Sequence, residues 1–564
     1  MKRTVVLLLL VGFLFSVGFI YTPQEGSYLA YSLEDVPKPR APLLPRITSA
    51  QQLVPFAKII LQRDYIGQRL GWSIKGGEKV LLIVNNRIHP WVVEALTTAL
   101  YELRCPVEVI HQERKLVRWK NGTQEWADEA LRLMEQRLSE DLNTPPAKEY
   151  PSWVGSGTPR PRNPGLRLTE EQLKNYDVVI GPHLGPRNQP GLISSLSYIA
   201  TPELLASPRI LFPGELMDFM ETKIWAVIRA AERVRVRGVQ GTDFSFTWFP
   251  EWWEIVEGTH PKIRSGADQS TFNTLRPGRS EYAVFAGHLL LHPRYGSIDG
   301  SDAHGVVMSQ EGDWGHMWPP LAIHVNDGEI SEIENGGFFG DFWRSSLELT
   351  KDIQYPGFAR PGTGWLEEFA LGTNPKVFGP MRVKELENVD GRDPQSISWS
   401  YARDRSGAVH GGYGTLGSKW WNSIYQMPAG HYHQFFFFLD YDVTTRDGRT
   451  TRVMDKGHLT YLDDPEVRAM AAQYGDPDQI LREDWIPEVT PEGKIIRPET
   501  RLIPYDEWLA QLPIKPDDPR LIYRIPEHLK KFYGEDRIRF YDPEEFLEFY
   551  RSIGQIPVKR VSRK

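Results

Sequence analysis

A strand–helix–strand pattern near the start of the chain constrains the fold more than any other feature of the sequence. The run from Val80 to Val84 is wholly apolar, as in a strand buried on both faces, and a second strand-like run covers residues 107–110. Between them, residues 91–103 repeat apolar side chains at helical spacing. Two strands joined through a helix pair in parallel. We therefore expect a Rossmann-like α/β layer domain over residues 51–235, with an insertion at 112–165.

The pattern changes after about residue 236. Short strand-like runs, glycine turns and tryptophans replace the alternation of strands and helices, and the dipeptide Asp327-Gly328 between two such runs is typical of a β-hairpin. Ten of the 14 histidines fall between His260 and His458, so we expect the chemistry in this part of the chain. The sequence predicts a mixed α+β, mainly β, catalytic domain over residues 236–460.

The remaining segments frame these two predicted domains. Residues 22–50 are rich in proline and are interpreted as a linker, and the charged, proline-punctuated residues 461–564 as an accessory C-terminal extension. At the N-terminus, Lys2 and Arg3 precede 18 uncharged residues that end at Tyr21. This pattern fits a signal peptide cleaved after Gly18, and it is also long enough for a membrane anchor. Both alternatives place the folded chain on the periplasmic or extracellular face.

Charge and cysteine content exclude several classes of site. The net charge of −7 makes nucleic acid a poor partner. The chain has a single cysteine, Cys105, so it can form neither an intramolecular disulfide nor a cysteine-rich metal site. No Gly-x-Gly-x-x-Gly follows the first strand, so a dinucleotide site lacks support. Any bound metal must use His, Asp, Glu or Tyr.

The stretch "AGHYHQFFFFLDYDV" places His431 and His433 two residues apart, directly before four phenylalanines. Alternate residues of a strand face the same side, so both imidazoles point together where a buried strand begins. This pair is either one side of a metal site or two surface histidines. Glu368, ahead of another apolar strand, and His410, in a glycine-rich turn, are further candidates.

The order of several short motifs resembles the aminopeptidase T type metallopeptidase family. The motifs are "KGGEKVLLIV", "GTDFSF", a Gly-x-Ser-Glu strand, "EEFALGTNP", "HGGYG" and the histidine-led strand. The related ring-cleaving dihydroxypyridine dioxygenases share much of this order. The resemblance extends over roughly residues 50–445. It implies a metal-dependent hydrolase that releases N-terminal residues from peptides.

The resemblance also implies a set of site residues. The peptidases bind two metal ions through two glutamates, two histidines and an aspartate, and a tyrosine assists. In this sequence the position of the aspartate is occupied by His433. The implied catalytic residues are Glu368, as general base, and Tyr413. The implied metal ligands are Glu281, Glu368, His410, His431 and His433.

The histidine at position 433 changes the metal chemistry that we expect. A carboxylate can bridge two cations, whereas a neutral imidazole binds one metal ion through one nitrogen. A single divalent ion on His410, His431 and His433 suits zinc, with a position left open for water. Manganese, cobalt and iron are the alternatives.

Three functions follow from these observations. The favoured one is an exported metal-dependent hydrolase similar to the aminopeptidases. The others are a mononuclear Fe(II) ring-cleaving dioxygenase and an exported binding protein without catalysis. Each has a peptide or small-molecule ligand and touches a membrane only through the N-terminal segment. The oligomeric state stays open, with a homodimer as one option.

Overall fold

The computed structural model of this 564-residue chain describes most of the predicted strands and helices. The described residues are 36, 40, 42–64, 72–85, 88–112, 174–181, 192–193, 196–247, 288–289, 302–312, 317–352, 361–377, 382–383, 405–414, 431–484, 489–494 and 499–524. The predicted leader, all of the predicted insertion except residue 112, and Glu281 lie outside them.

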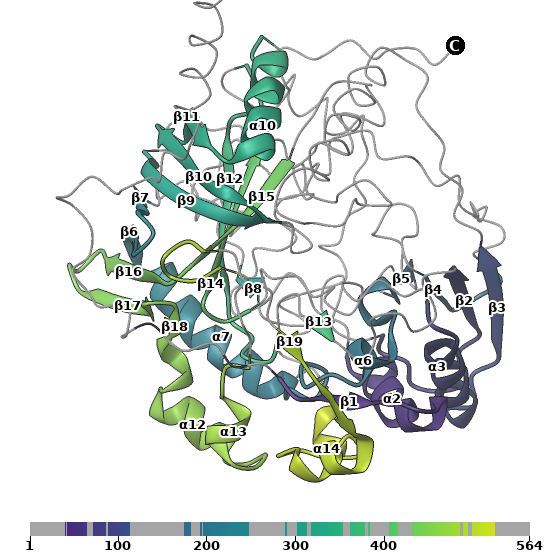
Figure 1. Cartoon of the computed structure of the whole chain (residues 1–564). Coiled ribbons are helices and arrows are strands. Elements are labelled where there is room, and N and C mark those ends of the chain that lie inside the picture. The colour runs from purple at the N-terminus through teal and green to yellow at the C-terminus, as the bar shows by residue number, and fades with distance from the viewer. Residues whose placement is uncertain are drawn as a thin grey trace, which may run out of the picture.

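A parallel sheet of four strands forms the N-terminal part of the described chain (Figure 1). Strand β2 (Val80–Asn85) lies between β3 (Val107–Gln112) and β4 (Val178–Ile180), and β5 (Leu192–Ile193) pairs with β4. Helix α3 (Pro90–Glu102) connects β2 to β3, so the predicted strand–helix–strand unit is confirmed. A Rossmann-like layer is not confirmed, because β4 and β5 span only three and two described residues.

Local chemistry explains where α3 begins and which face it buries. Nδ1 of His89 accepts a hydrogen bond from the backbone N–H of Trp91 at 3.2 Å. Pro90 occupies the first helical position, where a missing N–H costs nothing. Val92, Leu96 and the other buried apolar residues of α3 recur at spacings of three and four, and they belong to the same hydrophobic cluster as β2.

A large, curled antiparallel sheet dominates the rest of the molecule, which is therefore of the mixed α+β class. Twelve strands of the described chain belong to it. In spatial order they are β18 (His458–Leu459), β17 (Thr450–Asp455), β16 (Leu439–Thr445), β6 (Ala231–Gly238), β7 (Asp243–Thr247), β9 (His304–Gly312), β15 (His431–Phe437), β14 (Ala408–Gly414), β12 (Leu366–Gly372) and β8 (His288–Leu289), with β10 (Met317–Asn326) and β11 (Glu329–Asn335) branching from β9.

The predicted hairpin at Asp327-Gly328 connects β10 and β11. Both turn residues have positive φ angles, +49° and +75°, as a two-residue turn between twisted antiparallel strands requires. Helix α10 (Gly337–Thr350) follows β11 directly and packs on this hairpin (Figure 1). Nη1 of Arg344 on α10 donates to the carbonyl of Ile333 at 2.9 Å, which ties the helix to β11.

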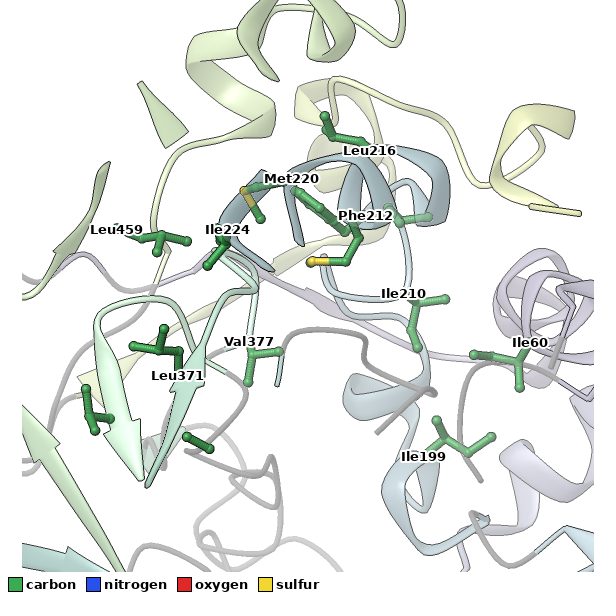
Figure 2. Packing of buried hydrophobic residues seen from close by; sticks show 14 of the residues in the cluster. Ile60, Ile199, Ile210, Phe212, Leu216, Met220, Ile224, Leu371, Val377 and Leu459 are labelled. Carbon is green, nitrogen blue, oxygen red and sulfur yellow. The ribbon is translucent and has the colours of Figure 1, made fainter. Parts of the chain in front are cut away.

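Helix α7 (Gly214–Arg229) lies within one hydrophobic cluster that includes residues from both sheets. Figure 2 shows Met220 of α7 in this cluster, together with Leu371 from the large sheet and Ile60 and Ile199 from the N-terminal part. Ile60 belongs to α2 (Val54–Gln62). The short helix α6 (Pro202–Leu205) precedes α7. The described core is thus continuous between the two sheets.

The C-terminal segment packs along the molecule as a series of short elements. They are α12 (Pro465–Ala471), α13 (Pro477–Ile480), β19 (Glu499–Thr500), β20 (Leu502–Pro504) and α14 (Tyr505–Gln511). Strand β20 pairs in parallel with β1 (Leu44–Arg46), and β19 with β13 (Arg382–Val383). Figure 1 shows α12 beside α7 and α14 beside β1. The segment therefore joins parts of the chain that are far apart in sequence.

Polar contacts attach this segment to β12 and β14, which lie near one edge of the large sheet. Lys376, in the turn after β12, donates to Oδ2 of Asp484 at 2.6 Å, and both side chains are almost fully buried. Ser406, just before β14, donates to Oε1 of Glu483 at 2.6 Å. Breaking a buried ion pair by removing one partner typically costs about 3–5 kcal/mol, because the remaining charge stays buried. The ends of β12 and β14 are therefore held by the C-terminal segment.

His458 adds a titratable contact to the same attachment. Its Nδ1 lies 2.8 Å from Oε2 of Glu483 and its Nε2 lies 2.8 Å from Oδ2 of Asp463. The hydrogen bond to Glu483 contributes most, and together the two carboxylates raise the pKa of His458 to about 9 although burial opposes this.

None of the helices in the part of the chain that the structure describes is long and apolar enough to cross a membrane.

Replacing His458 with Asn is expected to destabilise the fold more at pH 6 than at pH 10. A histidine whose pKa is higher in the folded chain stabilises the fold below its unfolded pKa of about 6.5. That stabilisation is lost as the pH rises to about 9. Urea unfolding at both pH values measures the difference, with His111→Asn at an exposed position as the control. Equal destabilisation at pH 6 and pH 10 would contradict the assigned charge state.

Candidate metal centre

One buried face of the large sheet brings two of the predicted histidines together. In the antiparallel pair of β14 and β15, His410 lies opposite Phe435, and Gly412 lies opposite His433. Directly opposed residues have their side chains on the same side of the sheet, as do residues two apart along one strand. His410, His433, Phe435 and Phe437 therefore share one face, which we call the histidine face.

The histidine face is separate from the main hydrophobic core. Phe436 points to the opposite side of β15, where its ring stacks on Phe369 with centroids 5.8 Å apart. It belongs to the main cluster, whereas Phe435 and Phe437 are equally buried and do not. The described part of the sheet thus has buried side chains on both sides. The side that carries Phe436 is mainly apolar, and the other side is the histidine face.

The imidazoles of His410 and His433 are in direct contact. Their ring centroids lie 4.3 Å apart and the rings are nearly perpendicular, at 78°. His410 is fully buried and its ring stacks on Phe435 at 5.2 Å, while His433 is partly exposed. The register of β14 and β15 thus brings two imidazoles into edge-to-face contact at one point of the sheet.

The backbone register places Glu368 in the same row of the sheet. On β12, Glu368 lies opposite Gly412, which in turn lies opposite His433. Gly412 contributes no side chain to this row, so no β-carbon stands between position 368 and His433. The side chain of Glu368 is outside the described residues, and only its backbone position is assigned.

Two further predicted ligands are not placed by the described residues. His431 begins β15 opposite Gly414, but its side chain is not described. Glu281 lies outside the described residues altogether. The convergence of His410 and His433 is therefore observed, and the participation of His431, Glu281 and Glu368 stays a prediction.

Tyr413 does not lie with the histidines, contrary to the prediction that it assists catalysis from the rim of their site. It pairs with Tyr432 and points into the main core, where its ring meets Trp343 of α10 at 5.4 Å. The reason is the alternation of a strand, since positions 410 and 413 are three residues apart and face opposite sides. Burial raises the pKa of the Tyr413 phenol well above its usual range.

A buried ion pair on the histidine face was not predicted from the sequence. Glu311 of β9 lies opposite Phe435, and its Oε1 is 3.3 Å from Nη2 of Arg405. Both side chains are fully buried, and the guanidinium of Arg405 lies 4.6 Å from the ring centre of Phe437. The signal that could have revealed Glu311 is a single acid inside the strand-like run "GVVMSQEG".

The opposite charges of Glu311 and Arg405 stabilise each other inside the protein. Burial raises the pKa of the Glu311 carboxyl, and the positive charge of Arg405 acts in the opposite direction. Charges removed from water remain ionised only where a partner compensates them. Arg405, just before β14, thus links this strand to β9 across β15.

The donors on this face suit a transition-metal ion of borderline softness. Imidazole nitrogen is a preferred ligand for zinc, copper, nickel and iron, and a carboxylate at position 368 would add an oxygen donor. The partial exposure of His433 leaves one side of the pair open to solvent.

Comparisons with known proteins show distant similarities of fold. The 2,5-dihydroxypyridine dioxygenase of Pseudomonas putida aligns with a TM-score of 0.39 and 14% identity, over 75% of this chain and 99% of that one. AmpT from Thermus thermophilus aligns with a TM-score of 0.34 and 13% identity, over 72% and 99% of the two chains. No family model and no curated protein matches the sequence. Similarities this low indicate no more than a distant relation of fold.

Replacing Tyr413 with Phe is expected to leave metal binding unchanged. The Tyr413 hydroxyl has no hydrogen-bond partner among the described residues, so its removal should leave stability unchanged or raise it by up to about 1–3 kcal/mol. Metal content and urea unfolding measure both effects. Tyr432→Phe is the matched control, because the Tyr432 hydroxyl lies 2.6 Å from Ser346 Oγ and its loss should destabilise by about 0.5–1.5 kcal/mol. Loss of metal from Tyr413→Phe would restore the original assignment.

Proposed function

We propose that this chain is an exported metal-dependent hydrolase that removes N-terminal residues from peptides. The observation that carries the proposal is the contact of His410 with His433 on a buried face outside the main core. Two neighbouring strands bring a pair of imidazoles into contact, and imidazole nitrogens are common ligands of zinc and other transition-metal ions. The leader sequence supports the exported location, and the motif order described above supports the reaction class.

The residues fit a single divalent ion better than a pair of ions. His410 and His433 supply two nitrogens. The backbone of Glu368 lies in the same row of the sheet as His433, and His431 lies two residues before His433 on β15. With His433 in place of an acid, the described donors offer no carboxylate bridge between two cations. Zinc suits this donor set, and manganese, cobalt and iron are the alternatives.

Each protein group has a role in the proposed reaction. A bound ion would polarise the scissile carbonyl and acidify a water molecule. Glu368, as general base, takes the proton of that water, and a positioned carboxylate typically contributes about 10²–10⁴-fold to the rate. Phe435 supports the ring of His410 by stacking, and Glu311 with Arg405 fixes the strands on either side.

Metal analysis combined with peptide hydrolysis tests the proposal. The purified full-length chain should hold one transition-metal ion on the histidine face and shorten unblocked peptides from the N-terminus, and chelation should abolish both properties. His410→Gln and His433→Gln should each lose this histidine-face ion and the peptide hydrolysis with it. Glu368→Gln should retain the ion through the histidines and lose about 10²–10⁴-fold in rate. His304→Gln, at the start of β9, is the control, because its ring contacts Ser245 and Asp302 instead.

The alternatives give different results in the same experiment. Bound iron with consumption of O₂ and no peptide cleavage would identify a ring-cleaving dioxygenase. A chain that binds no metal under any condition would contradict the proposal and favour a non-catalytic binding protein.

A further inference from the structure

A second group of metal-ligating side chains lies on the β10–β11 hairpin, outside the histidine face. His324 of β10 is directly opposite Glu332 of β11, and Glu334 lies two residues further along β11. One donor atom from each of the three lies within 4.8 Å of the others. Elsewhere in the described chain, no group of three or more such side chains meets this distance. The three residues share one side of the hairpin, because positions 332 and 334 alternate with the buried Ile333.

The contact between His324 and Glu334 differs from an ordinary histidine–carboxylate hydrogen bond. Nε2 of His324 lies 2.8 Å from Oε1 of Glu334, yet it is shielded from solvent and makes no hydrogen bond among the described residues. His458 provides the contrast, since both of its nitrogens form hydrogen bonds to carboxylates at the same distance of 2.8 Å. At His324 the nitrogen and the oxygen are close without an N–H directed between them. The nitrogen and the oxygen are therefore both candidates to bind one cation after a small side-chain movement.

The backbone that carries the three side chains is well supported. Arg344 of α10 donates to the carbonyl of Ile333, between the two glutamates, and Ser331 Oγ donates to the carbonyl of His324 at 3.2 Å. Strand-borne ligands hold their geometry better than ligands on loops. The side chains of His324 and Glu334 are 31% and 40% exposed, so the group lies at the surface of the hairpin.

We propose that His324, Glu332 and Glu334 bind a divalent transition-metal ion, with Zn²⁺ as the best fit. One imidazole nitrogen and two carboxylate oxygens supply three ligands, and water completes the coordination. The two carboxylates offset the charge of the ion. The bound ion cross-links β10 to β11 and stabilises the hairpin on which α10 packs. This site is independent of the proposed hydrolase activity.

Zn²⁺ titration of the chelator-treated full-length chain tests the site by counting bound ions. The wild type should bind two ions, His410→Gln/His433→Gln one, His324→Asn/Glu334→Gln one, and the combination of all four changes none. His458→Asn is the matched control, because it also removes a histidine that lies between two carboxylates, and it should still bind two ions. Circular dichroism checks that each variant is folded.

The decisive comparison is made in the His410→Gln/His433→Gln background. Two results would overturn the proposal and identify the hairpin group as an ion pair only. In the first, the His410→Gln/His433→Gln variant binds no ion. In the second, adding His324→Asn/Glu334→Gln to that variant leaves the number of bound ions unchanged. If the His410→Gln/His433→Gln variant does not fold, the midpoint of thermal unfolding gives a second measurement, in which His324→Asn/Glu334→Gln is compared with the wild type. Excess Zn²⁺ should raise it less in His324→Asn/Glu334→Gln than in the wild type, and an equal rise would overturn the proposal.

Discussion

The register between β14 and β15 determines which side chains can form the candidate metal centre. Because side chains alternate along a strand, a slip of one residue would move His433 into the core and bring Tyr432 to the histidine face. Contacts on the core side oppose that slip. Phe436 stacks on Phe369, and Tyr432 contacts both Trp343 and Ser346 of α10. Each aromatic pair contributes about 0.5–1.5 kcal/mol beyond its buried area. The apolar side of the sheet therefore positions the polar side.

Polar contacts between residues far apart in sequence also fix the ends of β9, β12 and β14. Glu311 and Arg405 are 94 residues apart in sequence and join β9 to the start of β14. The next residue, Ser406, donates to Glu483, and Lys376 after β12 is paired with Asp484. The C-terminal segment thus braces the strands that carry His410 and Glu368.

Local features of the fold could be predicted from the sequence, and features set by distant contacts could not. The strand at Val80–Val84 and the turn at Asp327-Gly328 are each determined by a few neighbouring residues. The structure contains both the strand and the hairpin. Motif order predicted that His410, His431 and His433 converge, and the structure brings the rings of His410 and His433 into contact. Tyr413 was misassigned because a glycine-rich turn was expected at residues 408–414, where the structure has a regular strand. Strand alternation then places its ring in the core.

The ion pair of Glu311 could not be predicted from the sequence. A lone acid in a strand-like run carries no information about its partner, and Arg405 becomes its partner only when β9 and β14 flank β15 in the folded sheet. The hairpin group at His324 was missed for a related reason. Its three residues come together only through the register of β10 and β11, including an irregularity next to His324.

X-ray absorption spectroscopy of the zinc-loaded chain tests the central claim most directly. The His324→Asn/Glu334→Gln variant, loaded with one equivalent of Zn²⁺, confines the signal to the histidine face. We expect at least two imidazole ligands with zinc–nitrogen distances of about 2.0–2.1 Å. These ligands should be lost in the additional presence of His410→Gln and His433→Gln. A spectrum with oxygen ligands and no imidazole scattering would contradict the assignment of a metal ion to His410 and His433.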